Sequence, residues 1–294
     1  MRCPKCNAEF AKDASLIPGG VMQCPSCGRY LYDGEEFKKY TEEEIKLYHL
    51  KAKSGQVEEK IEPDGRVDNP AEQFEIGWKY YSKDVTKECK EKAFEWVKKA
   101  AENGYVTAQH FLGFYYDEGE GVPQDKEKAV EWYEKAANQG VVDSQIRLAE
   151  MFDKGIGIPK DKAKASFWYL KAADIGDVGS QLKIGKMLLD GDGIEQNKEK
   201  ARKWLLKAAE KDNSEAQVEL GMIYYNGNGV PKDFPEAEKW YKKAAEQGNL
   251  TAQSQLALMY SKGEDGVPRN DAEAKKWRDK AEAAKKCLEQ LGII

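Results

Sequence analysis

The chain has 294 residues, of which 34% are charged and 40% hydrophobic, and its net charge is −5 at pH 7. This composition is too polar for one large compact core and suits an elongated array with much surface per residue. The modest charge gives no general argument for binding nucleic acid or membranes, and without an apolar leader or the roughly 18 apolar residues of a spanning helix we expect a cytoplasmic protein.

The N-terminal segment, residues 1–33, contains four of the six cysteines as two Cys-x2-Cys pairs, Cys3 with Cys6 and Cys24 with Cys27. A disulfide framework would spread its cysteines through the fold, so this clustering indicates a metal site in a reducing compartment. Two thiolate pairs on tight turns can surround one ion tetrahedrally, and soft sulfur ligands in a closed site favour zinc over a redox or iron-bearing site. We predict one structural Zn²⁺ held by these four cysteines.

The stretch from Arg2 to Tyr32 resembles the small zinc ribbons found at the start of many bacterial proteins. The resemblance implies a ribbon that folds around its ion, because about thirty residues cannot build a stable apolar core. A ribbon that contacts DNA or RNA is the alternative, in which Phe10, Tyr30 and Tyr32 stack on bases. The same rings suit the small core of the ribbon itself, and the near balance of acidic and basic residues favours that structural role.

Residues 34–70 separate the ribbon from the rest of the chain. Thr41 and Glu44 form a capping box that predicts one amphipathic helix over 41–53. The segment that follows is rich in charged and turn-forming residues, and we interpret it as a linker.

From residue 71 onward the sequence repeats with a period of 36 residues. Six of the seven tryptophans mark the period, with one spacing of 37 at the end: Trp96, Trp132, Trp168, Trp204, Trp240 and Trp277. Lys-Ala-Ala follows three residues after each of the first five. Such a register indicates a repeat architecture rather than a set of separate sites.

Each unit contains two segments with helical periodicity, which we name helix A and helix B. Helix A reads small-Gln-x-x-Leu-Gly/Ala-x-x-Tyr, and helix B reads Ala-x-x-Trp-Tyr-x-Lys-Ala-Ala. The N-caps that we predict for helix B are Asp125, Asp161, Asn197, Asp233 and Asn270. Glycines are expected to end helix B in the left-handed conformation, and Asp212-Asn213 replaces the glycine at the fourth boundary.

These motifs resemble Sel1-like repeats, relatives of the tetratricopeptide repeat that carry a Gly-x-Gly-Val/Ile-Pro loop, as in "DEGEGVPQD" (117–125). The resemblance implies an all-α fold, a right-handed α/α solenoid of six helix-pair repeats behind the zinc ribbon, that acts as a protein-binding scaffold. We place the solenoid at 71–288 and a C-terminal tail at 289–294. The units are about 72–107, 108–143, 144–179, 180–215, 216–251 and 252–288.

An enzyme needs convergent acids, bases or nucleophiles, and the sequence offers few. The two histidines are His49 and His110, and His110 occupies a helix A position held elsewhere by residues such as Ile146, which indicates packing. Cys89 aligns with the helix B caps, where a helix N-terminus would lower the pKa of its thiol; the alternative is an incidental cysteine. We expect a non-enzymatic protein without a small-molecule substrate.

Function in a solenoid is expected where the copies differ, on the exposed positions of helix A. We predict a groove with an aromatic floor formed by Trp78, Phe111 and Phe114. A basic middle would follow, formed by Arg147, Lys183 and Lys186. Such a groove would suit a peptide with an apolar anchor and acidic residues. The alternative is that the aromatic side chains pack against a neighbouring unit or against the helix at 41–53.

The sequence therefore favours a cytoplasmic, non-enzymatic scaffold that binds a protein or peptide partner on its repeats. The second interpretation is a nucleic-acid-associated regulator, in which the zinc ribbon touches DNA or RNA while the solenoid recruits a partner protein. Phosphate contacts weaken steeply with salt, so a gel shift at several salt concentrations separates the two.

Overall fold

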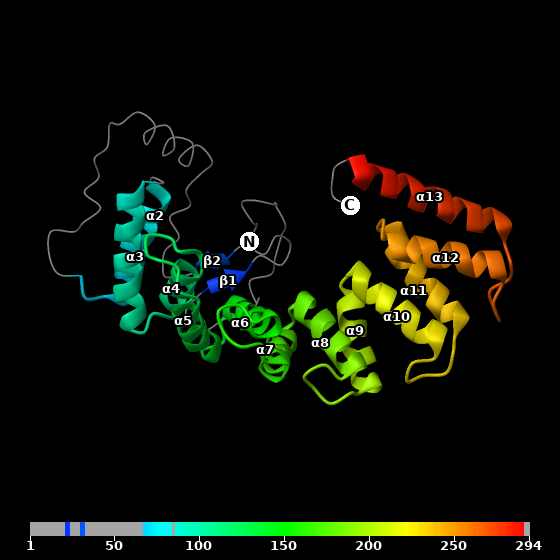
Figure 1. The fold of residues 1–294 in the computed structure, drawn as a ribbon, viewed down its shortest axis with the longest axis horizontal. Helices are drawn as coiled ribbons and strands as arrows, with labels where there is room; N and C mark the ends of the chain where they lie inside the picture. Colours follow the sequence, from blue (N-terminus) through cyan, green and yellow to red (C-terminus); the bar gives the residue numbers. More distant parts are fainter. Residues whose placement is uncertain (1–20, 24–29, 33–66, 84–85, 291–294) are drawn as a thin grey trace. The chain divides into compact units, whose positions relative to one another are not determined.

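A computed structural model describes residues 21–23, 30–32, 67–83 and 86–290 (Figure 1). Between residues 67 and 290 the chain is helical, with twelve helices joined by short loops. The helices are α2 (Pro70–Lys83), α3 (Lys87–Glu102), α4 (Val106–Glu118), α5 (Lys126–Asn138), α6 (Val142–Lys154), α7 (Lys162–Ile175), α8 (Val178–Asp190), α9 (Lys198–Glu210), α10 (Ser214–Asn226), α11 (Phe234–Glu246), α12 (Leu250–Lys262) and α13 (Asp271–Gln290).

Two short strands lie near the N-terminus, β1 (Val21–Gln23) and β2 (Tyr30–Tyr32). They pair antiparallel, with Met22 opposite Leu31. Cys24 and Cys27 fall between the strands in the sequence and lie outside the described residues, as do Cys3 and Cys6. The helix predicted at 41–53 and residues 54–66 of the linker also lie outside the described residues.

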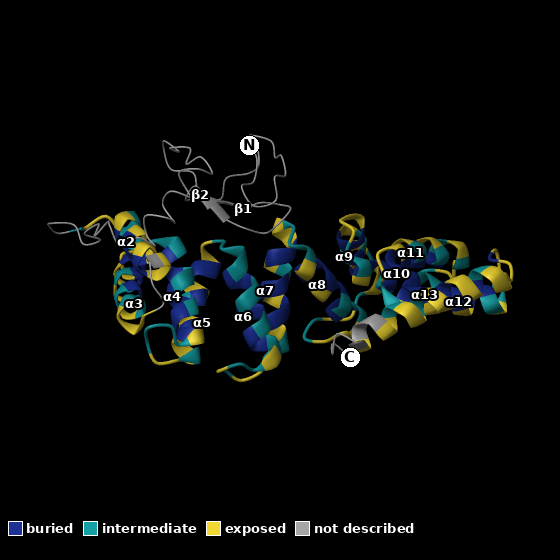
Figure 2. Cartoon of the chain, turned by 90° about the horizontal axis from the view of Figure 1, so that it is seen from above, coloured by how far each residue is buried: buried dark blue, intermediate teal, exposed yellow. Residues whose placement is uncertain are grey.

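The chain divides into two compact units, residues 1–141 and 142–294. In the first unit, each of α2, α3 and α4 packs against the helix that follows it, up to α5. In the second unit the same holds from α6 to α13. Buried residues lie where helices of one unit face each other (Figure 2). The even-numbered helices are helix A and the odd-numbered ones helix B of six helix pairs, as the sequence predicted.

The predicted caps of helix B are confirmed. The Asp161 carboxylate accepts a hydrogen bond from the Lys164 backbone N–H at 2.9 Å. Four other predicted caps accept a hydrogen bond in the same way, each from the backbone N–H three residues later in the chain: Asp125, Asn197, Asp233 and Asn270. These bonds satisfy N–H groups that have no partner inside the helix, so they fix where each helix B begins.

The helix ends also follow the prediction. Asp212 has a φ of 60° and is the one non-glycine residue with positive φ among the described residues. Its place is taken by glycine at the other helix B ends, for example Gly176 with a φ of 109°. A residue with a side chain tolerates this conformation less well than glycine, and Asp is among the more tolerant types.

The start of helix B differs in the first repeat from the position that the alignment of the copies indicates. Cys89 does not occupy the cap of α3, because the helix begins at Lys87 and Thr86 is its cap. The Thr86 hydroxyl oxygen accepts from the Cys89 backbone N–H at 3.4 Å. The first repeat lacks the Gly-Pro loop that sets the start of helix B in later copies, so α3 starts about one turn earlier.

His110 packs, as expected. Its ring lies 5.6 Å from that of Tyr133 and 5.4 Å from that of Phe111, measured between centroids. The imidazole therefore sits among aromatic rings on α4 and α5.

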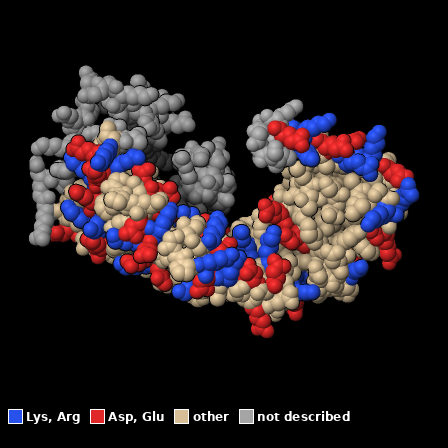
Figure 3. Space-filling model, viewed as in Figure 1, with Lys and Arg blue, Asp and Glu red and all other residues tan. Residues whose placement is uncertain are grey.

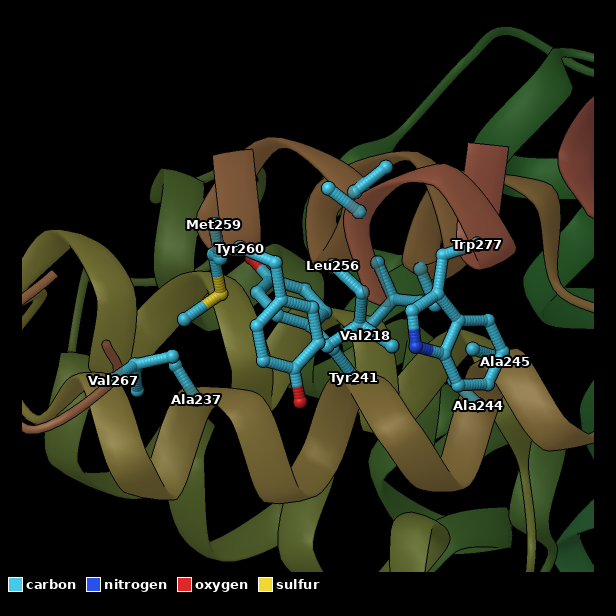
Figure 4. Packing of buried hydrophobic residues seen from close by; sticks show 13 residues of the cluster. Val218, Ala237, Tyr241, Ala244, Ala245, Leu256, Met259, Tyr260, Val267 and Trp277 are labelled. Atoms are coloured by element: carbon cyan, nitrogen blue, oxygen red, sulfur yellow. The ribbon is translucent and has the colours of Figure 1, made fainter. Parts of the chain in front are cut away.

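The core consists of leucine, aromatic and methionine side chains set against alanines. In the last two repeats, Tyr241 of α11, Leu256 and Met259 of α12, and Trp277 of α13 point toward one another (Figure 4). Gly221 of α10 lies against the Tyr241 ring, and a Cβ there would come within 2.5 Å of it. Small residues at these positions let neighbouring helices approach closely, which explains why they recur in every copy.

The repeated glutamine of helix A joins one repeat to the next. Gln217 on α10 donates from Nε2 to the Ala209 carbonyl at the end of α9, at 3.1 Å. The same bond links Gln253 to Ala245 at 3.1 Å. Two further pairs are linked in the same way: Gln109 to Ala101 and Gln181 to Ala173. A buried donor thus adds a second hydrogen bond to a carbonyl at the end of helix B, which also accepts from the backbone N–H three residues later.

A second contact completes this joint in some repeats. The Gln217 Oε1 accepts from Gln247 Nε2, thirty residues later, at 2.8 Å. In the repeat of Gln181, position 211 is a lysine, whose ammonium donates to the Gly176 carbonyl at 2.8 Å. The buried Gln181 Oε1 then has no hydrogen-bond partner among the described residues. The contacts between successive repeats therefore share the bond to the backbone carbonyl and differ in the side-chain hydrogen bonds that accompany it.

Candidate partner-binding surface

The six residues predicted to bind a partner belong to different units. Trp78 lies on α2, and Phe111 and Phe114 lie on α4, all in the first unit. The three basic residues lie in the second unit: Arg147 on α6, and Lys183 and Lys186 on α8. Each set is described within its own unit.

An aromatic stripe runs along α2. Phe74, Trp78 and Tyr81 recur at helical spacing and so share one side of the helix. The ring centroids of Phe74 and Trp78 are 6.3 Å apart, and those of Trp78 and Tyr81 are 5.5 Å apart. Both pairs are stacked, with interplanar angles below thirty degrees at 26° and 29°.

Helix α4 adds rings to this stripe. The Phe111 centroid lies 5.4 Å from that of Phe74 and 5.3 Å from that of Trp78. Tyr115 of α4 meets Tyr81 edge to face at 6.1 Å, and Phe114 meets Tyr115 at 6.2 Å. We name this set the aromatic surface: Phe74, Trp78 and Tyr81 of α2 with Phe111, Phe114 and Tyr115 of α4.

The aromatic surface combines packing with exposure. Phe111 is half-buried between the rings of α2, and Tyr115 is buried. Trp78 and Tyr81 remain 44% and 39% exposed, and they are two of the most exposed large apolar side chains in the described residues. Phe111 therefore packs against the helix of a neighbouring repeat, as one interpretation of the sequence expected, while Trp78 and Tyr81 stay exposed.

Burial and the nearby Tyr81 and Glu120 raise the pKa of the Tyr115 hydroxyl above its ordinary value. The phenol stays protonated at neutral pH, and the interior of the cluster is uncharged. An apolar floor with an exposed tryptophan rim is an arrangement that binds groups by stacking rather than by reacting with them.

Three aromatic residues of this surface were missed in the sequence: Phe74, Tyr81 and Tyr115. Phe74 and Tyr81 carried a signal, because they lie four residues before and three after Trp78, one turn of helix in each direction. The repeat alignment concealed that signal, since it compares positions between copies and not neighbours along one helix.

The basic residues are largely paired. Arg147 contacts the Glu150 carboxylate at 3.4 Å on the same helix. Lys186 reaches Glu219 on α10 at 2.9 Å, and this hydrogen bond raises the pKa of the Lys186 ammonium. Lys183 is exposed, and no ion pair is found for it within residues 86–290. Over α8 and α9, Lys and Arg lie beside Asp and Glu (Figure 3), so this region is less positive than the sequence suggested.

A groove of about 400 Å³ lies between α12 and α13. Leu250, Ala257 and Leu258 line one side, and Arg278, Glu282 and Lys285 line the other. In Figure 3 the surface over α12 carries no Lys, Arg, Asp or Glu, next to the line of charged side chains on α13. Sequence analysis did not predict this groove, because it depends on how α12 and α13 pack together.

No cluster of three or more His, Cys, Asp or Glu side chains suited to a metal occurs in the described part of the chain. The four cysteines predicted to bind zinc lie outside that part. None of the described helices has the length and apolar character needed to cross a bilayer.

Comparison with protein families identifies the repeats. The model of the Sel1 repeat matches six consecutive segments: 73–105, 106–141, 142–177, 178–213, 214–249 and 250–285. Comparison with curated proteins gives no match.

Two solved structures share the fold with substantial sequence identity. The first is c5321, a protective antigen present in uropathogenic Escherichia coli strains, at 36% identity and a TM-score of 0.68. The alignment covers 76% of this chain and 48% of that one, so the chain spans about half the length of that protein. The second is a Sel1 repeat protein from Oxalobacter formigenes, at 33% identity and a TM-score of 0.57, covering 82% of this chain and 99% of the other.

Proposed function

Because the chain belongs to the Sel1 repeat family, whose members generally act as protein-interaction scaffolds, we propose that it binds a protein or peptide partner through the exposed side of its A helices. The aromatic surface of the first unit is the anchor point. The partner contributes an apolar or planar group that covers Trp78 and Tyr81.

The exposure of Trp78 carries this proposal. Exposed tryptophans set among other rings are unusual on a surface that only meets water, and tryptophan is enriched among residues that dominate binding energy. The surrounding rings hold Trp78 in place through stacking with Phe74 and Tyr81. Little side-chain freedom is then lost when a partner binds.

The acidic character expected of the partner depends on the second unit. Lys183 remains available to a carboxylate, whereas Arg147 and Lys186 have carboxylate partners of their own. The apolar anchor is therefore the stronger part of the proposal, and the acidic contact the weaker.

Affinity purification with the full chain tests the function. We expect Trp78→Ala and Phe111→Ala to lose partners that the wild type retains, and Lys183→Glu to lose a smaller share. Phe167→Ala is the matched control, because Phe167 is an aromatic side chain 50% exposed on a B helix. Retention of every partner by both aromatic variants would show that the aromatic surface is not the site.

We also propose that Cys3, Cys6, Cys24 and Cys27 bind one structural Zn²⁺. The β1–β2 hairpin supports this, since its strands flank the second cysteine pair in the sequence and hairpins that end in a Cys-x2-Cys turn supply two thiolates at once. Free thiolates require a reducing compartment, and we propose a cytoplasmic location on that ground.

Metal analysis of the purified full chain tests the zinc site. We expect one zinc per chain in the wild type, loss of that zinc in the double variant Cys3→Ser/Cys6→Ser, and no change in Cys89→Ser. An iron signal in place of zinc, or zinc that persists in the double variant, would contradict the proposed site.

A further inference from the structure

Six of the seven tryptophans have a lysine over the ring. On each B helix, the lysine three residues after the tryptophan places its ammonium near the indole, from 3.5 Å for Lys135 over Trp132 to 5.6 Å for Lys171 over Trp168. The remaining pairs lie between these values: Lys99 over Trp96, Lys207 over Trp204, Lys243 over Trp240 and Lys280 over Trp277.

Trp78 is the exception. It lies on an A helix, apart from the six tryptophans of the B helices, and Tyr81 takes the position where those tryptophans have lysine. No Lys or Arg lies over its ring among the residues that the structure describes, although 44% of the side chain is exposed. Phe74 and Tyr81 stack on parts of this ring, and its exposed part keeps the electron-rich character of an indole, which attracts cations.

The charges that border Trp78 are negative on the exposed side. Glu75 lies one turn before Trp78, is exposed, and forms no ion pair within the described ranges. Lys79 follows Trp78 directly, so its side chain projects about 100° further around the helix, away from the stripe. A group bound on Trp78 therefore meets a carboxylate before it meets an ammonium.

We propose that the aromatic surface binds a basic segment of a partner protein, with an arginine stacked on Trp78 and its charge facing Glu75. This inference rests on the proposed function and names the chemical class of the partner at that site. Arginine suits it better than lysine, because the planar guanidinium stacks on an aromatic face and gives up its water more readily than an ammonium. The lysines of the B helices show the same attraction within the chain.

The test uses the full chain and pairs of immobilised synthetic peptides that differ at one central position. That position is arginine, citrulline or glutamate, and citrulline keeps the shape of arginine without its charge. A cation over an exposed or partly desolvated ring is worth about 0.5–2 kcal/mol, so we expect the arginine peptides to bind roughly 2- to 30-fold more tightly than the citrulline peptides. Glutamate peptides should bind least.

Variants locate the effect. Trp78→Ala should abolish the preference for arginine, Trp78→Phe should reduce it because phenylalanine is a weaker cation acceptor, and Glu75→Gln should reduce it and remove part of its salt dependence. Phe167→Ala should leave it unchanged. Circular dichroism of each variant checks that the helices remain folded.

Different failures have different meanings. If citrulline or glutamate peptides bind as tightly as arginine peptides and binding still requires Trp78, the inference of a basic partner is wrong and the proposed function stands. If no peptide binds, or if binding is indifferent to Trp78→Ala, both the inference and the proposed site are wrong. A peptide of residues 41–53 is added as a competitor. If it binds more tightly than the arginine peptides and displaces them, the occupant is the chain's own segment and the inference is also overturned.

Discussion

The two units build the same frame and fill its variable positions with different chemistry. In the first unit, Phe94 of helix B packs edge to face on Tyr116 of the next repeat's helix A, with centroids 5.5 Å apart. In the second unit, the equivalent of Phe94 is Arg202 or Glu238, and each hydrogen-bonds the hydroxyl of the tyrosine on the next helix A. The exposed side of helix A shows the same contrast, with rings in the first unit and ion pairs on α6, α8 and α10 of the second.

This difference separates what specifies the fold from what specifies the surface. The buried Leu, Ala, Gly and Gln positions recur in both units and hold the helices at the same spacing. The variable positions then take aromatic or charged residues without changing the backbone. A charged surface whose ions are paired within the chain offers less to a partner than exposed rings do, which is why the first unit carries the proposed site.

The largest expected effect concerns the shared frame. Leu112 in the first unit and Leu220 in the second are both fully buried. Replacing either with alanine should reduce the free energy of unfolding by about 2–5 kcal/mol, because the change removes buried methyl groups and leaves a cavity. Urea unfolding followed by circular dichroism measures the loss in each unit. If one of the two substitutions leaves the free energy of unfolding unchanged, the two units do not depend on this buried leucine position in the same way.

The next effect distinguishes two joints within the second unit. Gln217→Leu removes two hydrogen bonds, one to the Ala209 carbonyl and one from Gln247, and we expect a loss of about 2 kcal/mol. Gln181→Leu removes one bond to Ala173 and eliminates an oxygen that has no partner in the described residues, so the loss should be about 1 kcal/mol smaller. Thermal unfolding of the two variants side by side gives the comparison; equal losses would contradict it.

A smaller effect concerns the polar contacts of the second unit. Burial acts to raise the pKa of Glu238, but hydrogen bonds from Lys242 and Tyr260 outweigh it, and the pKa lies below its ordinary value of 4.5. The carboxylate therefore adds stability above pH 4.5, and this contribution is lost as the pH falls through the lower value of the folded state. Glu238→Gln should cost about 1 kcal/mol at neutral pH and nothing in strong acid.

Melting temperatures of the wild type and of Glu238→Gln across this pH range measure that effect. Phe94→Leu is the matched control in the first unit, since its contact with Tyr116 has no titrating partner and its cost should not change with pH. A constant difference between wild type and Glu238→Gln at all pH values would show that the carboxylate charge is not what stabilises the contact.

The smallest effect is a gain. Lys211→Gln places an amide at the position where Gln247 donates to Gln217 in a later repeat. The new amide can donate to the Gln181 oxygen, which has no partner among the described residues. We expect the free energy of unfolding to rise by about 0.5–1 kcal/mol. The lost bond from Lys211 to Gly176 is exposed and offsets little of this gain. Lys200→Gln on the surface of α9 is the control. A lower melting temperature for Lys211→Gln than for the control would overturn this explanation of the joint.

The sequence predicted the local features well. Helix B caps such as Asp161 and the left-handed Asp212 depend on chemistry within a few residues, which a sequence displays directly. Cys89 was misplaced because the first repeat lacks the loop that made the alignment reliable elsewhere.

The features that depend on packing between helices were less accessible. The contact between Gln217 and Gln247 joins residues thirty positions apart, and no local rule connects them. Trp78 and Phe111 were named from the sequence, but their contact with Phe74 and Tyr81, and the pairing of Lys186 with Glu219, required the helices to be placed side by side.

The joint between repeats has a consequence for how such chains change length. Its acceptor is a backbone carbonyl, as in the bond from Gln253 to Ala245, so it does not depend on which side chains the neighbouring copy carries. Duplication or deletion of one whole repeat within residues 142–294 would recreate the same donor, acceptor and alanine surface at the new boundary between repeats. One repeat can therefore replace another at such a boundary, and recombination can change the number of repeats while their exposed residues diverge.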